Sequence, residues 1–269
     1  MRKIISLAAV GTLALGLAAC SSDSGDDKKS DTLKVGASAV PHAEILDYIN
    51  KNLASKEGLK LDVKVFDDYS LQNPALDDGS ITANFFQHQP YLDKYNQEKG
   101  KDLVGVTRVH LEPLGVYSHK VKALADIKDG ATVAIPNDGT NAGRALKLLA
   151  DNGVIKLKDG VGVLAKESDV TDNPKHLKFK AQDAELLPRT LDDVDAAVIN
   201  GNYALQAKLT VKDALVAEKA EGNPYANILV VKKGHENDEN VLKLKKLLNS
   251  PEVKKFIEDK YQGSVIPAF

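Results

Sequence analysis

The chain has 269 residues, of which 43% are hydrophobic and only 5% aromatic, and it contains no tryptophan. Its 36 basic and 38 acidic side chains give a formal net charge of −2 at pH 7. Since no basic cluster interrupts this balance, the composition argues against a nucleic-acid-binding protein, which needs a basic surface. The even spread of hydrophobic residues is typical of a globular protein with one large or two small cores.

The first twenty residues have the pattern of a bacterial lipoprotein signal peptide. Arg2 and Lys3 precede an apolar run over residues 4–15, which is too short to span a bilayer as a stable anchor. The run is followed by "LAAC", the small-residue pattern that lipoprotein signal peptidase cuts before cysteine. We therefore expect residues 1–19 to be a signal peptide and Cys20 to carry the lipid anchor with its palmitate. An ordinary secretory peptide with an incidental cysteine is the alternative.

Cys20 is the only cysteine in the chain, which excludes an internal disulfide and a metal site with several thiolate ligands. The residues that follow it, up to residue 31, include no apolar side chain. Because such a segment cannot bury surface, we expect residues 20–31 to be a lipidated flexible tether. The expected location is the extracytoplasmic face of the cell membrane, with the protein lipid-anchored through Cys20.

Strands and helices are predicted in alternation from residue 32 onward. Apolar and polar side chains alternate from Leu59 to Val65, which is typical of a strand with one wetter face. Pro41 suits the first turn of a helix. The expected strands in this half are 32–38, 59–66, 81–86, 102–111 and 114–118, and the expected helices are 40–54 and 90–100.

The second half of the chain continues this alternation. Residues 131–153 predict a strand, a turn and a helix that ends at Gly153. Residues 192–208 repeat the same order. A strand at 227–234 and helices at 238–249 and 251–261 close the chain. The pattern predicts an α/β fold with mostly parallel sheets.

The length of the folded part favours two lobes, because it exceeds the commonest size of a single domain. We expect the chain to cross between the lobes near residues 112–114 and 225–230. Lobe 1 is then discontinuous and comprises residues 32–113 plus 229–269, whereas lobe 2 comprises residues 114–228.

Residues 81–95, "ITANFFQHQPYLDKY", gather aromatic residues around a histidine in a chain that is poor in aromatic residues. We expect Gln87–Gln89 to form a turn between a strand and a helix. Loops at the carboxyl ends of strands face the ligand crevice in open α/β sheets, so Phe86, His88 and Tyr91 can wall a pocket. Core packing, or the satisfaction of local backbone groups by His88, is the alternative.

Residues 135–146, "IPNDGTNAGRAL", join a predicted turn to the start of a helix. Thr140 or Asn141 can cap this helix, whose free N–H groups suit an anion. Arg144, in the early helix, can add the two parallel donors with which a guanidinium holds a carboxylate. The alternative is that Asn141 only caps the helix and Arg144 points to water.

Further candidates lie at the ends of other predicted strands. Asn200 ends one strand, and together with Asn202 it offers the donors and acceptors that a zwitterion needs. Asn227 precedes the strand at the second crossing, and Tyr69 follows the strand at 59–66. A loop cap at Asn200 and a hinge turn at Asn227 are the alternatives.

Enzyme motifs of the common hydrolase, zinc-protease and dinucleotide-binding classes are absent from the sequence. The six histidines are scattered, without a pair at the spacing of metal ligands. His42 is expected to be a turn or first-turn residue. We therefore predict that the protein is not an enzyme and has no cofactor and no metal site.

Six segments follow the lipobox in a fixed order: VGASAVPHAEIL, FDDYSLQNPAL, ANFFQHQPYL, IPNDGTNAGRAL, AVINGNYA and NPYANILV. In this order they resemble the methionine-binding lipoproteins of bacterial ABC importers, the MetQ/NlpA family. The resemblance covers essentially the whole chain after the signal peptide. Its most specific parts are the Phe-Gln-His-x-Pro-Tyr-Leu and Thr-Asn-x-x-Arg segments.

The resemblance implies an α/β, two-lobed, periplasmic-binding-protein-like fold with a ligand cleft between the lobes. It implies that Arg144 clamps the carboxylate of a free amino acid, that asparagines hydrogen-bond its amino and carboxylate groups, and that rings surround a thioether. The ligand-binding residues that it implies are Tyr69, Phe86, His88, Tyr91, Asn141, Arg144, Asn200 and Asn227.

The implied function is that of an extracytoplasmic substrate-binding protein that captures methionine, in the L form with the D form as a second candidate, and delivers it to an ABC importer. The implied partners are the ABC permease and its ATPase, with the lipid anchor in the membrane, no nucleic acid, and the protein itself a monomer. Two alternatives stay open. The same scaffold can bind another small amino acid or a methionine-containing dipeptide, or the protein is a surface interaction lipoprotein with a vestigial pocket.

Overall fold

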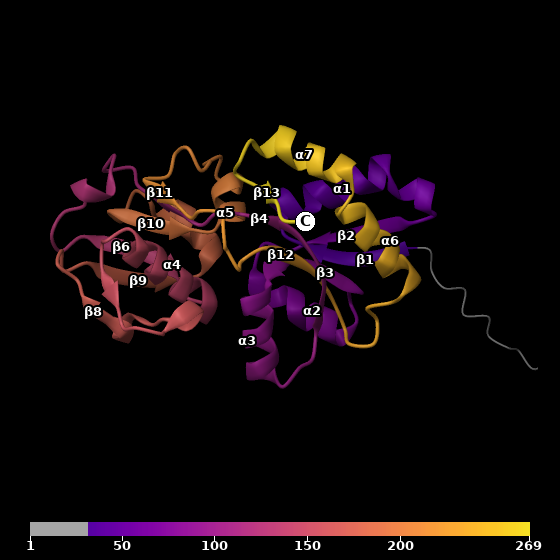
Figure 1. Ribbon diagram of the computed structural model, residues 1–269, viewed down its shortest axis with the longest axis horizontal. Helices are drawn as coiled ribbons and strands as arrows, with labels where there is room; N and C mark the ends of the chain where they lie inside the picture. Colours follow the sequence, from indigo (N-terminus) through magenta and orange to yellow (C-terminus); the bar gives the residue numbers. More distant parts are fainter. Residues whose placement is uncertain (1–31) are drawn as a thin grey trace, which may run out of the picture. The chain divides into compact units, whose positions relative to one another are not determined.

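The computed structural model describes residues 32–269 (Figure 1). The predicted signal peptide, Cys20 and the predicted tether lie outside the described residues. None of the helices found between residues 32 and 269 combines the length and the apolar character that crossing a bilayer requires. The described chain forms two larger sheets with helices packed against them, so the predicted two-lobed α/β fold is confirmed.

The first sheet has six strands in the order β13-β4-β12-β3-β1-β2. Strand β1 pairs in parallel with β2 and β3, but β12 runs antiparallel to both β3 and β4, and β13 runs antiparallel to β4. The prediction of mostly parallel sheets is therefore wrong, because β12 enters between β3 and β4 from the opposite direction. The strands are β1 (Thr32–Ala37), β2 (Lys60–Val65), β3 (Ala83–His88), β4 (Val104–Leu111), β12 (Asn227–Val231) and β13 (Ile266–Pro267).

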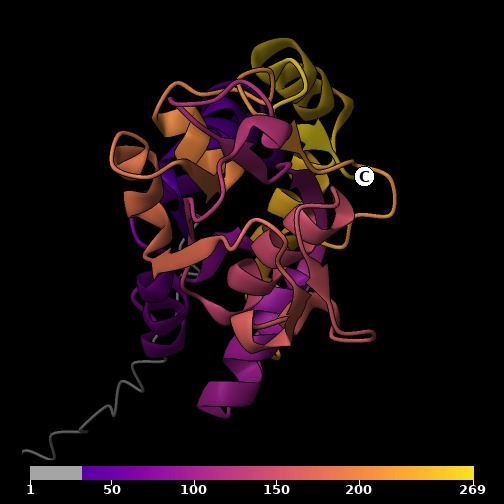
Figure 2. The same cartoon turned by 90° about the vertical axis from the view of Figure 1, so that its left-hand side faces the viewer.

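The second sheet has five strands in the order β11-β5-β10-β6-β9 and faces the viewer in Figure 2. Strand β6 pairs in parallel with β9 and β10, whereas β5 runs antiparallel to β10 and β11. A two-stranded ribbon, β7 (Lys156–Leu157) with β8 (Val170–Asp172), lies apart from this sheet in the pairing scheme. The strands of the second sheet are β5 (Gly115–Tyr117), β6 (Thr132–Pro136), β9 (Lys178–Gln182), β10 (Ala196–Ile199) and β11 (Val216–Ala217).

The chain passes from the first sheet to the second between β4 and β5, and it returns between β11 and β12. The first passage spans residues 112–114, and the return spans residues 218–226, which overlaps the expected 225–230 only at its end. The lobe limits at residues 113 and 228 stay a prediction, since membership of a sheet does not define where a lobe ends.

Helices from both ends of the chain cover the first sheet. Figure 1 shows α6 and α7, in yellow, next to α1. Helix α7 begins where sequence rules place it, because Ser250 accepts a hydrogen bond from the N–H of Val253 and Pro251 occupies the first position. The helices are α1 (Glu44–Asn52), α2 (Gln72–Asp78), α3 (Gln89–Lys99), α4 (Gly139–Asp151), α5 (Gly201–Gln206), α6 (Glu239–Leu248) and α7 (Pro251–Tyr261).

Each sheet has its own hydrophobic core. In the first, Val35, Phe85 and Leu229 of the strands meet helix residues such as Ile45 and Val253, and all of these side chains are fully buried. In the second, strand residues Val116, Val133 and Val198 pack against Leu146 and Leu149 of α4. Full burial of side chains of this size stabilises a fold by about 1.5–3 kcal/mol each, so each sheet holds its covering helices firmly.

The helix predicted from residue 40 begins later than expected. Val40 has extended backbone angles (φ −129°, ψ 135°), and the Val40–Pro41 peptide bond is cis. Regular α-helix starts only at Glu44, so the prediction that Pro41 lies in the first turn of this helix is wrong. Residues 39–43 form a separate short helical turn that brings His42 into the interior.

Helix α4 lies close to the turn at residues 162–164, and Gly143 makes this approach possible. A Cβ atom at position 143 would lie 2.5 Å from the carbonyl oxygen of Val163 and 2.8 Å from the backbone nitrogen of Ala165. Neither backbone atom can move without shifting the turn. At Gly139, in the first turn of the same helix, the atoms in the way belong to the flexible side chain of Lys94.

We expect Gly143→Ala to lower the free energy of unfolding by about 1–3 kcal/mol through overpacking, although alanine has the higher helix propensity. Gly139→Ala is the matched control, and it should cause no loss because Lys94 can swing away. Urea unfolding followed by circular dichroism measures both. Equal midpoints for the two variants would contradict the close packing at Gly143.

Candidate functional site

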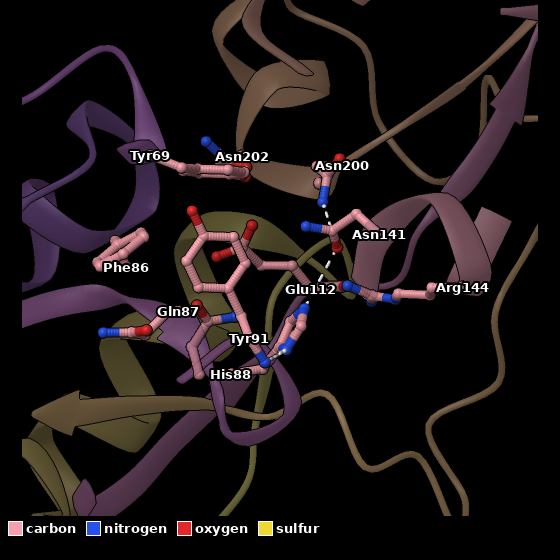
Figure 3. A pocket seen from close by; sticks show the side chains of 12 residues that line it. Tyr69, Phe86, Gln87, His88, Tyr91, Glu112, Asn141, Arg144, Asn200 and Asn202 are labelled. Atoms are coloured by element: carbon pink, nitrogen blue, oxygen red, sulfur yellow. Dashed lines mark hydrogen bonds between the residues drawn. The ribbon is translucent and has the colours of Figure 1, made fainter. Parts of the chain in front are cut away.

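A small pocket lies where elements of the first sheet meet elements of the second (Figure 3). Its cavity volume is about 20 Å³, which is room for about one water molecule. A ligand the size of an amino acid therefore requires the walls to move apart. The lining residues are Tyr69, Phe86, Gln87, His88, Tyr91, Glu112, Asn141, Arg144, Asn200, Gly201, Asn202 and Asn227.

All eight residues that the sequence singles out as ligand-binding line this one pocket. They come from five separate stretches of the chain, and the first and last are more than 150 positions apart. The structure thus brings the predicted set together, while its role in binding stays a prediction. The sequence-based list omits Gln87, Glu112, Gly201 and Asn202.

Strand β3 leads directly into α3 without the turn predicted at Gln87–Gln89. His88 is the last residue of the strand and also the N-cap of the helix, where its Nδ1 accepts a hydrogen bond from the N–H of Tyr91 at 3.2 Å. Alternate side chains of a strand point to opposite faces. Phe86 and His88 share one face of the strand and line the pocket, whereas Phe85, on the opposite face, is fully buried in the core of the first sheet.

Three rings form the apolar end of the pocket. The ring centroids of Tyr69 and Phe86 lie 5.7 Å apart, those of Phe86 and Tyr91 5.6 Å, and those of Tyr69 and Tyr91 6.2 Å. These separations fall in the range in which edge-to-face and tilted pairs attract. Burial raises the pKa values of Tyr69 and Tyr91 well above the ordinary value of a tyrosine, so both hydroxyls are neutral at pH 7.

Helix α4 is capped by Asp138, and the prediction that Thr140 or Asn141 caps it is wrong. Oδ1 of Asp138 accepts hydrogen bonds from the N–H groups of Thr140 at 3.2 Å and Asn141 at 2.9 Å. Because the helix begins earlier than expected, Asn141 lies in its first turn and its side chain faces the pocket. Its Oδ1 accepts from Nδ2 of Asn200 at 3.1 Å and lies 3.2 Å from Nε2 of His88.

The hydrogen bonds of His88 fix its tautomer. Nδ1 accepts from a backbone N–H, so in the neutral ring Nε2 carries the hydrogen and donates it to Asn141. Burial, together with the nearby charge of Arg144, lowers the pKa of His88 to about 3. This imidazole is therefore neutral at pH 7 and serves as a hydrogen-bonding wall between the two sheets.

Arg144 is buried, so the alternative in which it points to water is wrong. Its Nε and one Nη donate to the carboxylate of Glu218 at 2.7 Å and 2.6 Å, and the same Nη donates to the backbone oxygen of Glu112 at 3.0 Å. The guanidinium also lies over the ring of Tyr225, 4.3 Å from its centroid. Burial opposes the charge, but Glu218 outweighs it and holds the pKa of Arg144 above its ordinary value.

The asparagines offer hydrogen-bonding atoms to the pocket. Oδ1 of Asn200 and Nδ2 of Asn202 are buried without a partner within residues 32–269. Asn200 makes no side-chain cap of α5, and Asn227 is the first residue of β12, so the loop-cap and hinge-turn alternatives are wrong. Oδ1 of Asn202 accepts from the hydroxyl of Tyr69, which links the ring wall to α5.

A buried cluster behind the pocket escaped the sequence analysis. Nε2 of His110 lies 2.7 Å, and Nε2 of His42 3.3 Å, from the same Oε1 of Glu112. Nε2 of His42 also lies 3.1 Å from Oδ1 of Asn227. These residue types can bind metals, and their ligand atoms lie within 4.8 Å of one another, but the separations are those of hydrogen bonds. The scatter of histidines along the sequence concealed this convergence.

The cluster contains two neutral rings and a carboxylate. Burial lowers the pKa of His42 to about 4 and that of His110 to about 3. Burial also raises the pKa of Glu112, against the opposing influence of His42 and Arg144. Glu112 directly follows β4 at the first crossing, and this position after a strand is the signal that also identifies Tyr69 in the sequence.

Comparison with known proteins agrees with the resemblance seen in the sequence. The chain is 40% identical to the D-methionine-binding lipoprotein MetQ of Salmonella typhimurium over 98% of both chains, and 41% identical to the methionine-binding lipoprotein MetQ of Bacillus subtilis over 99% of both. A solved structure of a nutrient binding protein from Burkholderia cenocepacia bound to methionine superimposes with a TM-score of 0.85 at 46% identity, covering 88% of this chain and all of that one.

The family model for the NlpA lipoproteins matches residues 33–269, which is all but the first of the described residues. The match includes both sheets and every residue that lines the pocket. The chain therefore belongs to the NlpA lipoprotein family.

Proposed function

We propose that this protein is a lipid-anchored, extracytoplasmic substrate-binding protein that captures methionine and delivers it to an ABC importer. The observation that carries the proposal is that a buried guanidinium and a three-ring wall line the same pocket. These two groups match the two ends of methionine, a carboxylate and a thioether. The methionine-bound relative from Burkholderia cenocepacia supports this choice of ligand.

The carboxylate of the ligand is assigned to Arg144 and its surroundings. Glu218 uses Nε and one Nη of Arg144, so the other Nη is free to meet a ligand carboxylate within the described fold. Nδ2 of Asn202 is an unused donor in the same pocket. A carboxylate held by charged and neutral donors in a dry site gains more than it would at a surface.

The thioether is assigned to the wall of Tyr69, Phe86 and Tyr91. A thioether sulfur is polarizable and gains about 0.3–1.5 kcal/mol from each contact with an aromatic ring edge. The neutral hydroxyls of the tyrosines keep this end of the pocket free of charge. An ionic side chain would lose its hydration there without a partner, which favours an apolar tail.

Capture requires the walls to open and close. The chain crosses between the sheets at two places, which is an arrangement that suits hinge motion. Methionine then stabilises the closed arrangement because it contacts both walls at once. The closed protein, a monomer tethered through Cys20, is proposed to present its ligand to a membrane permease that an ATPase drives, and no catalytic step is assigned to this chain.

A methionine-containing dipeptide is the second candidate ligand. A further hollow borders Arg144, and Lys147, Glu218 and Tyr225 are among its lining residues. A ligand longer than one amino acid can extend past the guanidinium into this hollow. Its charged walls suit a peptide terminus.

We expect freshly purified protein to carry one equivalent of methionine, or to take it up. Native mass spectrometry gives the stoichiometry and the mass of any bound ligand, and calorimetry with L-methionine, D-methionine and a glycine–methionine dipeptide ranks the candidates. Absence of binding by all three, with the protein folded by circular dichroism, would rule out the proposed function and favour a surface interaction lipoprotein.

Arg144→Lys should weaken methionine binding by about 10- to 100-fold, which corresponds to one lost charge-assisted hydrogen bond. Lysine keeps the charge but cannot hold Glu218 and the ligand in a planar fork. Arg189→Lys is the matched control, because Arg189 is exposed, and it should bind as the wild type does. A methionine affinity of Arg144→Lys within twofold of the wild type would remove Arg144 from the site.

The wall of Tyr69, Phe86 and Tyr91 predicts that methionine binds more tightly than an analogue in which a methylene group replaces the sulfur. Wild-type protein should bind methionine about 2- to 10-fold more tightly than norleucine, the value expected from one sulfur–ring contact. Phe86→Leu should reduce this ratio, whereas Phe256→Leu, which changes a ring stacked on Tyr48 in the core of the first sheet, should leave it unchanged. Competition calorimetry gives the ratio, and an unaltered ratio in Phe86→Leu would argue against the assignment.

A further inference from the structure

Glu112 is a buried carboxylate in the pocket wall. It has no role in the assignments made above for the carboxylate and the thioether of the ligand. Its side chain is only 6% exposed, and Figure 3 shows it among the other lining side chains. It stands at the crossing between β4 and β5, beside α5. Gly201 makes this approach possible, because a Cβ there would lie 2.7 Å from Cβ of Glu112.

The charge of Glu112 has no dedicated counter-ion among residues 32–269. Arg144 is a cation that contacts Glu112, but it donates to the backbone oxygen of Glu112 and not to its carboxylate. The ion pair of Arg144 is with Glu218. The two histidines that contact the carboxylate are neutral, because burial lowers the pKa of each. Burying a carboxylate without a countercharge is costly, so a cation that enters the pocket gains from meeting it.

The carboxylate is held firmly in spite of this missing charge. His110 and His42 both place Nε2 on Oε1, and the backbone N–H of Asn202 donates to the carboxylate as well. Both neighbours of Nε2 of His42 are oxygen atoms, so this nitrogen carries a hydrogen and donates. These contacts fix the position of the group but bring no positive charge to it.

We propose that Glu112 receives the α-ammonium group of the ligand and that His42 and His110 are positioning residues for this carboxylate. The proposal rests on the proposed function, since it names the partner of the remaining charged group of methionine. The zwitterion then spans two opposite charges in the wall, its carboxylate at Arg144 and its ammonium at Glu112. Oδ1 of Asn200, an unused acceptor in the same wall, takes a second ammonium hydrogen.

The first test compares two ligands in two proteins. Glu112→Gln keeps the shape and removes the charge, and 4-(methylthio)butanoate keeps the carboxylate and thioether but lacks the ammonium. Calorimetry should show that Glu112→Gln binds methionine about 10- to 100-fold more weakly than the wild type, the loss of one charged hydrogen bond. The same variant should bind 4-(methylthio)butanoate at least as tightly as the wild type. Glu258→Gln, in which an exposed carboxylate of α7 is changed, is the matched control and should alter neither affinity.

Equal losses for both ligands in Glu112→Gln, or unchanged methionine binding, would overturn the role of Glu112. Failure of the wild type to bind methionine would instead refute the proposed function. The comparison is then repeated with whichever α-amino acid the wild type does bind and with the analogue of that amino acid that lacks the ammonium group. If it binds none, the assignment of Glu112 falls as well.

The histidines are tested by rescue. His110→Leu removes the donor to Oε1, whereas His110→Gln keeps an N–H near the position of Nε2. His110→Leu should weaken the binding of methionine by about 3- to 10-fold more than the binding of 4-(methylthio)butanoate. His110→Gln should restore most of the lost methionine affinity. If His110→Leu weakened the binding of both ligands equally, His110 would have only a structural role.

A pH titration of the wild type keeps the proposal testable if Glu112→Gln does not fold. Burial raises the pKa of Glu112, so its charge is lost as the pH falls, and methionine affinity should fall over a pH range above the one in which an ordinary glutamate titrates. The binding of 4-(methylthio)butanoate should not weaken. Other groups near Glu112 keep their charge state in this range: His42, His110, Arg144, Tyr69 and Tyr261. A flat profile for methionine, or a parallel fall for both ligands, would contradict the proposal.

Discussion

The buried ion pair of Arg144 and Glu218 is the interaction on which the pocket depends. A guanidinium can lie inside a protein only when its charge is matched, because an unpaired buried charge costs several kcal/mol. Glu218 supplies this match through two hydrogen bonds. Arg144 is thereby held in the wall with donor capacity left over. The same residue also donates to the backbone of Glu112, which ties α4 to the end of the first sheet.

Direct hydrogen bonds join the two halves of the wall across the pocket. His88 contacts Asn141, Tyr69 contacts Asn202, and the hydroxyl of Tyr203 donates to the backbone oxygen of Asp67 at 2.7 Å. Each such bond contributes only about 0.5–1.5 kcal/mol net. The closed arrangement is therefore held by modest forces, which a zwitterion that bridges both walls can outweigh. A binding protein needs this balance, because a wall that closes too firmly without ligand would reduce its own affinity.

The polar part of the pocket shows a division of charge. Arg144 is neutralised within the protein, whereas Glu112 is supported only by neutral donors. An amino acid brings one charge of each sign, and our proposal assigns its two ends to these two differently supported groups. Neutral histidines suit the second role, because their N–H groups fix a carboxylate without cancelling its charge. The cluster thus links residues of the turn before α1 and of β4 to the chemistry of the pocket.

Local patterns in the sequence determine most elements of this protein. The alternation of apolar and polar residues predicts β2, and the elements expected within residues 102–111, 131–153 and 251–261 correspond to β4, α4 and α7, because such local features act over a few neighbouring positions. Sequence reasoning missed α2 and β9, and it placed a turn at Gln87–Gln89 where strand runs into helix. These short elements carry weak periodicity of their own and depend on pairing with distant strands. The helix cap was assigned to the wrong residue because Asp138 and Asn141 are equally good caps in isolation.

The candidate site divides in the same way between sequence and tertiary structure. Eight of its residues could be named from family-like segments, and their residue types alone suggest a zwitterion with an apolar tail. Only the tertiary structure decided that Glu218 pairs with Arg144 and that His42, His110 and Glu112 converge on one atom. His42 and Asn227 touch across 185 positions of sequence, and no local pattern reports such a contact. The sequence by itself determined most of the elements, because propensity and periodicity are local. The packing of two sheets decided which charges meet, because that depends on the whole chain at once.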